Sequence, residues 1–272
     1  MIPYHVQRAF KLKGPSLLLE GGTRDVYRVG DRIVKQMVST SFENPYTFHL
    51  LPWLAEHLTG VDDDGFRLSR PVQSVDGEWV VEGGWTVWTY LEGRAIHTKD
   101  LRAAIKSNQA LHYALREIPK HPSFDQNDAA WGFAHEHCFG DRPDWVHPVL
   151  EGLVDALYAL RHPLPPMKCQ VIHGDLNHKN VLVAAGLPVG FVDLTPFWAP
   201  VDFALAMFAN WMGPRRGDVA VLRYFEDVPY FEQLLLRAAI RMLLVVSHLE
   251  GVEGWETSSE KKAVEIVLDY VM

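Results

Sequence analysis

Residues 171–193 constrain the fold of this chain more than any other segment. They run VIHGDLNHKNVLVAAGLPVGFVD and contain two short valine-rich runs, Val181–Val183 and 189–192. Such runs predict the two strands of a hairpin, preceded by a loop that follows an apolar stretch. The hairpin would place Asn180, at the start of its first strand, beside Asp193, at the end of its second.

Three polar side chains of this segment have the chemistry that phosphoryl transfer requires. The carboxylate of Asp193 and the amide oxygen of Asn180 suit a hard cation such as Mg²⁺, which takes oxygen ligands. Asp175 stands one loop turn away, where it could orient or deprotonate an incoming hydroxyl. Loop-capping aspartates and a turn asparagine would explain the same residues without any activity. Their combination between valine-rich runs favours phosphoryl transfer, in which positioning and charge neutralisation supply most of the catalysis.

The pattern resembles the catalytic loop and metal-binding motif of the protein-kinase-like superfamily. More narrowly, HGDLNHKN followed by VDLT is similar to the aminoglycoside phosphotransferase family. The resemblance implies an α+β fold of two lobes, a small antiparallel-sheet N-lobe and a larger, mainly helical C-lobe. It also implies that Asp175 is the catalytic base, that Asn180 and Asp193 hold Mg²⁺, and that His173 braces the loop. Asp202 opens the apolar helix DFALAMF and is expected to cap it or to brace the catalytic loop.

By the same resemblance, the N-terminal half supplies a site for ATP or another nucleoside triphosphate. Gly22, in a Gly-Gly pair between two predicted strands, would cover the phosphates, and Lys35 on the third strand would pair with them. Glu43 is the expected partner of that lysine, although it lies about a turn earlier than the family pattern places a glutamate. The backbones of Thr89 and Leu91, at the end of a strand, would hydrogen-bond the adenine.

Hydropathy patterns divide the chain into an N-terminal lobe, 1–91, and a C-terminal lobe, 92–272. The first lobe is predicted to hold a helix at 46–59 and strands at 16–20, 25–29, 32–38, 71–75 and 78–90, with Gly30-Asp31 as a tight hairpin turn. The second is predicted to hold helices at 101–117, 149–160, 201–211, 219–225, 230–249 and 260–270. Residues 119–148, rich in Pro, His and Asp, are predicted to be irregular.

Composition limits the partners and the compartment. Lys and Arg number 26 against 34 Asp and Glu, a net charge of −8, which argues against nucleic acid or an anionic membrane as a partner. Two cysteines cannot form a disulfide scaffold. The first residues, MIPYHVQRAFKLKG, lack the apolar core of a signal peptide, and the most apolar stretch, 238–249, is too short to span a bilayer. We therefore expect a cytoplasmic protein.

Together these observations predict an ATP-dependent, Mg²⁺-requiring phosphotransferase that acts on a hydroxyl of a small molecule. Protein kinases typically carry a lysine two residues after the catalytic aspartate, where this chain has Asn177. Only residues 194–201 separate Asp193 from Asp202, too few for a peptide-docking platform. The alternative is a nucleotide-binding pseudokinase with a regulatory or scaffolding role. Transfer of a nucleotidyl group by the same fold also stays open.

The sequence leaves the acceptor unidentified. In aminoglycoside-modifying relatives, acidic side chains of the helical lobe bind the cationic drug. Five acidic residues here could do the same, although solvated helix faces explain them equally well: Glu226, Asp227, Glu232, Glu253 and Glu256. The Pro-Arg-Arg segment at 214–216 is most simply a helix start after Gly213, with phosphate binding as the alternative.

Overall fold

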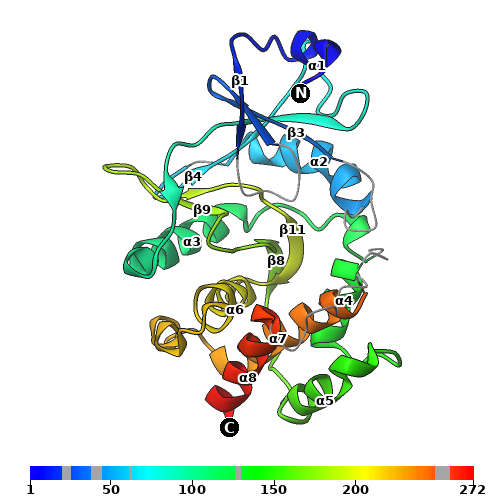
Figure 1. Ribbon diagram of the computed structural model, residues 1–272, viewed down its shortest axis with the longest axis vertical. Coiled ribbons are helices and arrows are strands. Elements are labelled where there is room, and N and C mark those ends of the chain that lie inside the picture. The colour runs from blue at the N-terminus through cyan, green and yellow to red at the C-terminus, as the bar shows by residue number, and fades with distance from the viewer. Residues whose placement is uncertain (20–25, 38–44, 62, 126–129, 249–257) are drawn as a thin grey trace.

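The computed structural model describes residues 1–19, 26–37, 45–61, 63–125, 130–248 and 258–272. Figure 1 shows an upper part built around a sheet and a lower part built of helices, with the two chain termini at opposite ends of the long axis. This arrangement matches the predicted α+β class.

The upper sheet has five antiparallel strands in the order β1-β2-β3-β6-β5. They are β1 (Ser16–Leu19), β2 (Val26–Val29), β3 (Arg32–Gln36), β5 (Pro71–Val72) and β6 (Trp85–Thr89). Val29 pairs with Arg32 across the turn Gly30-Asp31, where Gly30 has a φ of 60°. Glycine adopts this conformation without steric cost, so the predicted tight hairpin is confirmed.

A small hydrophobic core lies on one face of this sheet, covered by the helix α1 (Tyr4–Ala9). Val6 of the helix and Val34 and Val87 of neighbouring strands are fully buried there. Successive side chains of a strand point to opposite faces, so Lys35, next to Val34, points away from this core.

A second sheet joins segments from both halves of the sequence. Its strands, in the order β4-β10-β9-β7, are β4 (Arg67–Leu68), β10 (Gly190–Phe191), β9 (Val181–Val183) and β7 (Arg94–Ala95). Strand β10 runs parallel to β4 and antiparallel to β9. A separate antiparallel ribbon consists of β8 (Cys169–His173) and β11 (Pro196–Pro200). Strands β8 and β9 hold the two ends of the loop that contains Asp175.

The lower part is built from helices on one extensive core. The α-helices after the upper sheet are α3 (Leu101–Leu115), α4 (Ala130–Phe139), α5 (Glu151–Ala159), α6 (Val201–Met212), α7 (Phe231–His248) and α8 (Ser259–Val271). Helix α7 packs against α4, α6 and α8. Short 3-10 helices connect them at Thr98–Asp100, Pro122–Asp125, Pro148–Leu150, Pro214–Arg216 and Val219–Tyr224. No helix within the described ranges has the length and apolar character needed to cross a membrane.

Several sequence predictions differ from the structure. Residues 119–148 are not irregular throughout, because α4 forms within them and buries small side chains such as Ala134 and Cys138. Its stability comes from packing against α7 rather than from an amphipathic stripe that sequence could reveal. The strand predicted at 78–90 is confined to β6, since Gly83 and Gly84 both have positive φ and form a turn. The helix predicted at 219–225 is a 3-10 helix, Val219–Tyr224, and α1 and β11 were not predicted.

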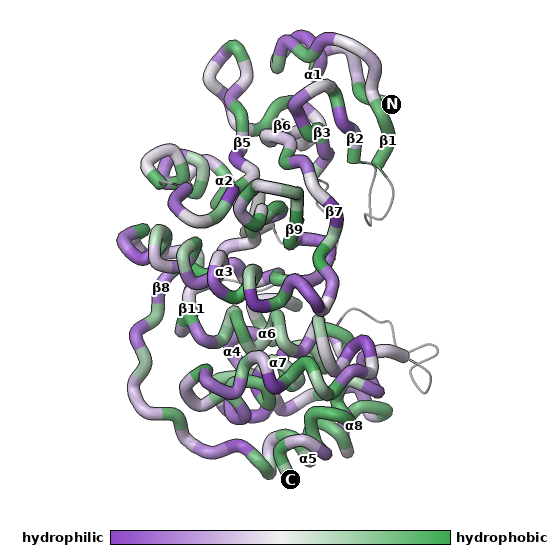
Figure 2. The backbone as a smooth tube through the Cα atoms, turned by 90° about the vertical axis from the view of Figure 1, so that its left-hand side faces the viewer, coloured by the Kyte–Doolittle hydropathy of each residue, from purple (hydrophilic) through white to green (hydrophobic). Residues whose placement is uncertain are grey.

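The division of the chain at residue 91 stays a prediction. The core of the upper sheet lies wholly within residues 1–91. Leu54 and Leu58 of α2 (Pro45–Leu58) and Phe66, however, pack into the large core of the helical part. In Figure 2, β7 and β9 lie between the upper sheet and the lower helices.

Candidate active site

The hairpin predicted from sequence forms and brings two of the candidate residues together. Phe191 pairs with Val181, and the Val192 N–H donates to the Asn180 carbonyl at 3.0 Å. Asn180 therefore lies opposite the residue that precedes Asp193, as expected. Asp193 has a φ of 57°, an uncommon conformation for a residue other than glycine and one that is found at functional sites.

The Asp175 carboxylate is held by two side-chain amides. Asn180 Nδ2 donates to Asp175 Oδ2 at 2.9 Å and to the Asp175 carbonyl at 2.8 Å, and Asn177 Nδ2 donates to Oδ1 at 3.2 Å. Burial, and next the charge of Asp193, raise the pKa of Asp175 to about 6, while these amides lower it. The group is thus mostly ionised at pH 7 yet close enough to neutrality to accept a proton.

His173 links the loop to the hairpin. Its Nε2–H donates to the Val192 carbonyl at 3.1 Å, and its Nδ1 accepts from the Asp175 N–H at 3.3 Å. The side chain is fully buried, and burial lowers its pKa to about 4. His173 is therefore neutral, with one nitrogen donating and the other accepting, and it holds the backbone of Asp175 in place.

His112 of α3 supports the backbone at the start of this loop. This role was not predicted from the sequence. Its Nε2 accepts from the His173 N–H at 3.1 Å, and its Nδ1–H donates to the Asn108 carbonyl at 2.9 Å. Burial lowers its pKa to about 4, so it stays neutral. One feature of the sequence could have indicated this role: His112 follows Leu111 on the buried side of a helix whose exposed side is polar.

Lys35 connects the upper sheet to the hairpin. Its ammonium group forms an ion pair with the Asp193 carboxylate and lies 4.7 Å from the centre of the Trp88 ring. The pair joins residues 158 positions apart, and it was not predicted. The Lys35 side chain thus reaches the region between the two parts of the molecule. The nucleotide phosphates are predicted to bind there.

The two backbone positions expected to bind adenine differ in their hydrogen bonding. The Thr89 N–H donates to the Arg70 carbonyl at 2.8 Å, and the Thr89 carbonyl accepts from Ser69 Oγ at 2.7 Å. The N–H of Thr89 is therefore already used, and only its carbonyl retains an accepting lone pair. Leu91 follows β6, and its backbone makes no hydrogen bond to a described residue.

The structure does not support a site role for the three remaining candidates, Asp202, Gly22 and Glu43: one lacks the predicted contact and two are not described. Asp202 is the second residue of α6, whose N-cap is Pro200 and has no side-chain capping bond, so the capping prediction is wrong. The chain enters α6 directly from β11, which leaves Asp202 inside the first turn. Burial raises the pKa of Asp202, and its side chain makes no hydrogen bond or ion pair with a described residue. Gly22 and Glu43 lie outside the described residues.

Asn180 and Asp193, the predicted metal ligands, would by themselves be an incomplete ligand set for a metal ion. Among the described residues, no three His, Cys, Asp or Glu side chains gather where they could share a cation. Mg²⁺ is commonly bound by one or two protein oxygens, with waters and nucleotide phosphates completing its shell. Asn180 turns its NH₂ group toward Asp175, which leaves its Oδ1 facing away and able to meet a cation. These residues therefore fit a nucleotide-bound Mg²⁺.

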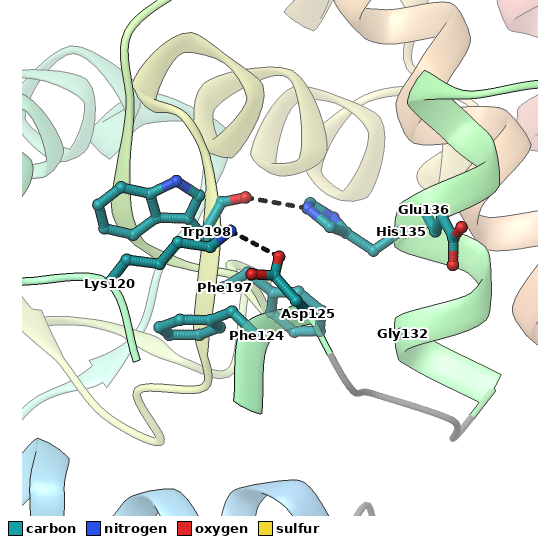
Figure 3. Close-up of a pocket in the computed structure, with 8 residues that line it drawn as sticks. All are labelled: Lys120, Phe124, Asp125, Gly132, His135, Glu136, Phe197 and Trp198. Atoms are coloured by element: carbon teal, nitrogen blue, oxygen red, sulfur yellow. Dashed lines mark hydrogen bonds and ion pairs between the residues drawn. The ribbon is translucent and has the colours of Figure 1, made fainter. Parts of the chain in front are cut away.

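A pocket of about 310 Å³ lies between β11 and α4 (Figure 3). Phe124, Phe197 and Trp198 provide aromatic surface, and Lys120 forms an ion pair with Asp125 at 2.5 Å. A Cβ added to Gly174 would fall 2.0 Å from the Phe197 ring, so one pocket wall lies directly against the loop that contains Asp175. The volume is suited to a small ligand.

The family model of the phosphotransferase enzyme family, APH, matches residues 17–235, which is most of the chain. The chain belongs to this family. The matched range contains Lys35, Asp175, Asn180 and Asp193, and the resemblance seen in the sequence is confirmed. Comparison with the curated proteins gives no match.

Similar solved structures confirm the two-lobed protein-kinase-like fold. Amicoumacin kinase hAmiN, in complex with AMP-PNP, Ca²⁺ and Ami, has a TM-score of 0.61 at 14% identity, over 98% of this chain and 92% of that one. Spectinomycin phosphotransferase APH(9)-Ia, in complex with ADP and spectinomycin, has a TM-score of 0.56 at 12% identity, over 97% and 95%. Plasmodium vivax ethanolamine kinase has a TM-score of 0.54 at 10% identity, over 94% and 81%.

Proposed function

We propose that this chain is an ATP-dependent, Mg²⁺-requiring phosphotransferase that transfers the γ-phosphate to a hydroxyl of a small molecule. The observation that carries the proposal is the fixed Asp175 carboxylate, held by two amides, with a pKa near 6. A base of this pKa accepts a proton efficiently near neutral pH. The nucleotides bound in similar solved structures, ADP and AMP-PNP, support nucleotide binding by this chain.

In the proposed reaction, Asp175 Oδ accepts the proton of the acceptor hydroxyl. The hydroxyl oxygen forms a bond to the γ-phosphorus as the bond between that phosphorus and the departing ADP oxygen breaks. Lys35 forms an ion pair with the nucleotide phosphates. The Leu91 backbone and the Thr89 carbonyl form hydrogen bonds with the edge of the adenine. Asn180 and Asp193 would hold Mg²⁺, which would neutralise phosphate charge when bound.

A small acceptor is favoured over a protein by the chain that follows Asp193. This segment forms β11, is paired along its whole length with β8, and enters α6 at Val201. A docking platform for a peptide would need a longer segment with an unpaired surface. The small-molecule acceptors in the solved relatives, such as spectinomycin, agree with this assignment.

The first prediction concerns nucleotide binding. ATP with Mg²⁺ at about 100 times its dissociation constant is expected to stabilise the wild type by about 2.7 kcal/mol, measured as a raised unfolding midpoint. In Asp193→Ala, which removes the carboxylate, we expect the Mg²⁺-dependent part of this shift to be lost. Asp144→Ala, an exposed carboxylate remote in sequence from the loop, is the control. A wild type that is not stabilised by ATP or GTP would contradict the proposal.

The second prediction concerns pH. Because Asp175 must be ionised to accept a proton, we expect kcat/KM to fall as pH falls through about 6. The pKa is raised from 3.8 to about 6, so the native state holds this proton more tightly than the unfolded chain does. The contribution of Asp175 to the free energy of unfolding therefore decreases as pH rises across that interval. A rate profile that is flat between pH 5 and about 7 would exclude Asp175 as the base.

A further inference from the structure

Basic side chains gather on one side of the catalytic loop, where the proposed function has not used them. His178 and Lys179 belong to the loop itself, and Arg215 and Arg216 belong to the 3-10 helix Pro214–Arg216 that follows α6. Burial lowers the pKa of His178, and the charges of Arg216, Lys179 and Arg215 lower it further. The two segments meet at Trp211, whose ring lies 6.4 Å from the His178 ring and 3.6 Å from the Arg215 guanidinium.

The cluster adjoins the loop that contains the proposed catalytic base, because His178 lies three residues after Asp175. Burial lowers the pKa of Arg215, while the carboxylate of Glu260 and then that of Asp175 raise it. An anionic group bound by the cluster would leave an adjacent hydroxyl of the same molecule near Asp175.

Arg215 is fixed in position as a binding group would be. Its guanidinium lies 3.6 Å from the centre of the Trp211 ring and forms an ion pair with Glu260 of α8. Its side chain is only 15% exposed. A guanidinium that is stacked and ion-paired loses little further conformational entropy when it binds an oxyanion.

Two buried nitrogens of the cluster lack a partner within the described part of the chain. They are His178 Nδ1 and Arg215 Nε, and the His178 ring lies 6.4 Å from the Trp211 ring. Arg216 is exposed and forms no ion pair with a described carboxylate. Buried polar atoms usually have hydrogen-bond partners, so a bound ligand could supply the partners of these two nitrogens.

We propose that His178, Arg215 and Arg216 bind an anionic group, a carboxylate or a phosphate, on the acceptor. The acceptor is then an acidic alcohol rather than a polycation such as an aminoglycoside. Arginine binds such oxyanions through paired, charge-assisted hydrogen bonds, whereas a cation at the same place would be repelled. This inference rests on the proposed function, because it assigns the substrate class of that site.

The test uses four small alcohols that differ in charge: glycerol, glycerate, glycerol 3-phosphate and 3-aminopropane-1,2-diol. Dissociation constants are measured by calorimetry at constant ionic strength, with and without saturating AMP-PNP and Mg²⁺. We expect glycerate or glycerol 3-phosphate to bind about tenfold or more tightly than the amine. The preferred acid distinguishes a carboxylate site from a phosphate site.

Two variants locate the binding. Arg216→Glu is expected to raise the dissociation constant of the preferred acid about five- to tenfold, because it reverses a charge that supports no other described contact. Arg8→Glu, an exposed reversal in α1, is expected to leave it unchanged. Lys35→Met is expected to weaken AMP-PNP but not the acid. If Lys35→Met abolishes acid binding, the anion occupies the nucleotide site and the inference is wrong.

The remaining outcomes are also decisive. Tighter binding of the amine than of both acids, absence of binding by both acids, or an equal effect of Arg216→Glu and Arg8→Glu would overturn the inference. None of these results would contradict the proposed function. The proposed function would be wrong if AMP-PNP with Mg²⁺ gave no binding heat in the wild type.

Discussion

Replacing Asp175 with Asn is expected to lower kcat by about 10²–10⁴-fold while leaving the dissociation constant of ATP within about twofold. The amide cannot accept the hydroxyl proton, whereas the groups proposed to hold the nucleotide, among them Lys35 and Leu91, are unchanged. ADP release and nucleotide binding are measured on the same preparation. Asp141→Asn, an exposed aspartate in a loop, is the matched control and should retain wild-type turnover.

The same variant distinguishes an enzyme from a pseudokinase. In an enzyme, Asp175→Asn separates turnover from nucleotide binding. In a pseudokinase, the wild type binds ATP without releasing ADP in the presence of any acceptor, and Asp175→Asn changes neither measurement. Turnover by Asp175→Asn within tenfold of the wild type would show that another group takes the proton, and our assignment of the base would be wrong.

Replacing Gly174 with Ala is expected to lower the free energy of unfolding by about 1–3 kcal/mol. The added Cβ would lie 2.0 Å from Phe197 Cδ2, and neither side can easily yield. The Gly174 N–H donates to the Thr195 carbonyl at 2.7 Å, and the Phe197 ring is buried, 4.7 Å from the Arg241 guanidinium. Because Gly174 precedes Asp175, a shift of the loop should also reduce kcat.

Urea unfolding measures this effect, and Gly152→Ala in α5 is the matched control. A Cβ at Gly152 meets nothing within 4 Å, so that substitution should be neutral or stabilise by up to about 1 kcal/mol. In Gly174→Ala, a further Phe197→Leu substitution should recover part of the lost turnover, because it makes room for the methyl group. Equal unfolding free energies for Gly174→Ala and Gly152→Ala would show that the loop relaxes without cost.

The sequence determined the parts of this protein that depend on short separations along the chain. Asn180 lies opposite Val192, next to Asp193, because two valine-rich runs close to each other can pair in only a few ways. The Gly30-Asp31 turn follows from glycine at a positive φ. Helices with an apolar stripe, such as α3 and α8, were predicted for the same local reason.

Only the tertiary structure decided the contacts between distant segments. Lys35 meets Asp193, and His112 of α3 meets the backbone of His173, through the packing of separate elements. Helix α4 has small buried residues and no clear stripe, so it is defined by its contact with α7. Local propensity and spacing carry no information on which distant surfaces meet. That choice is made by burial of the common core, which is a property of the whole chain.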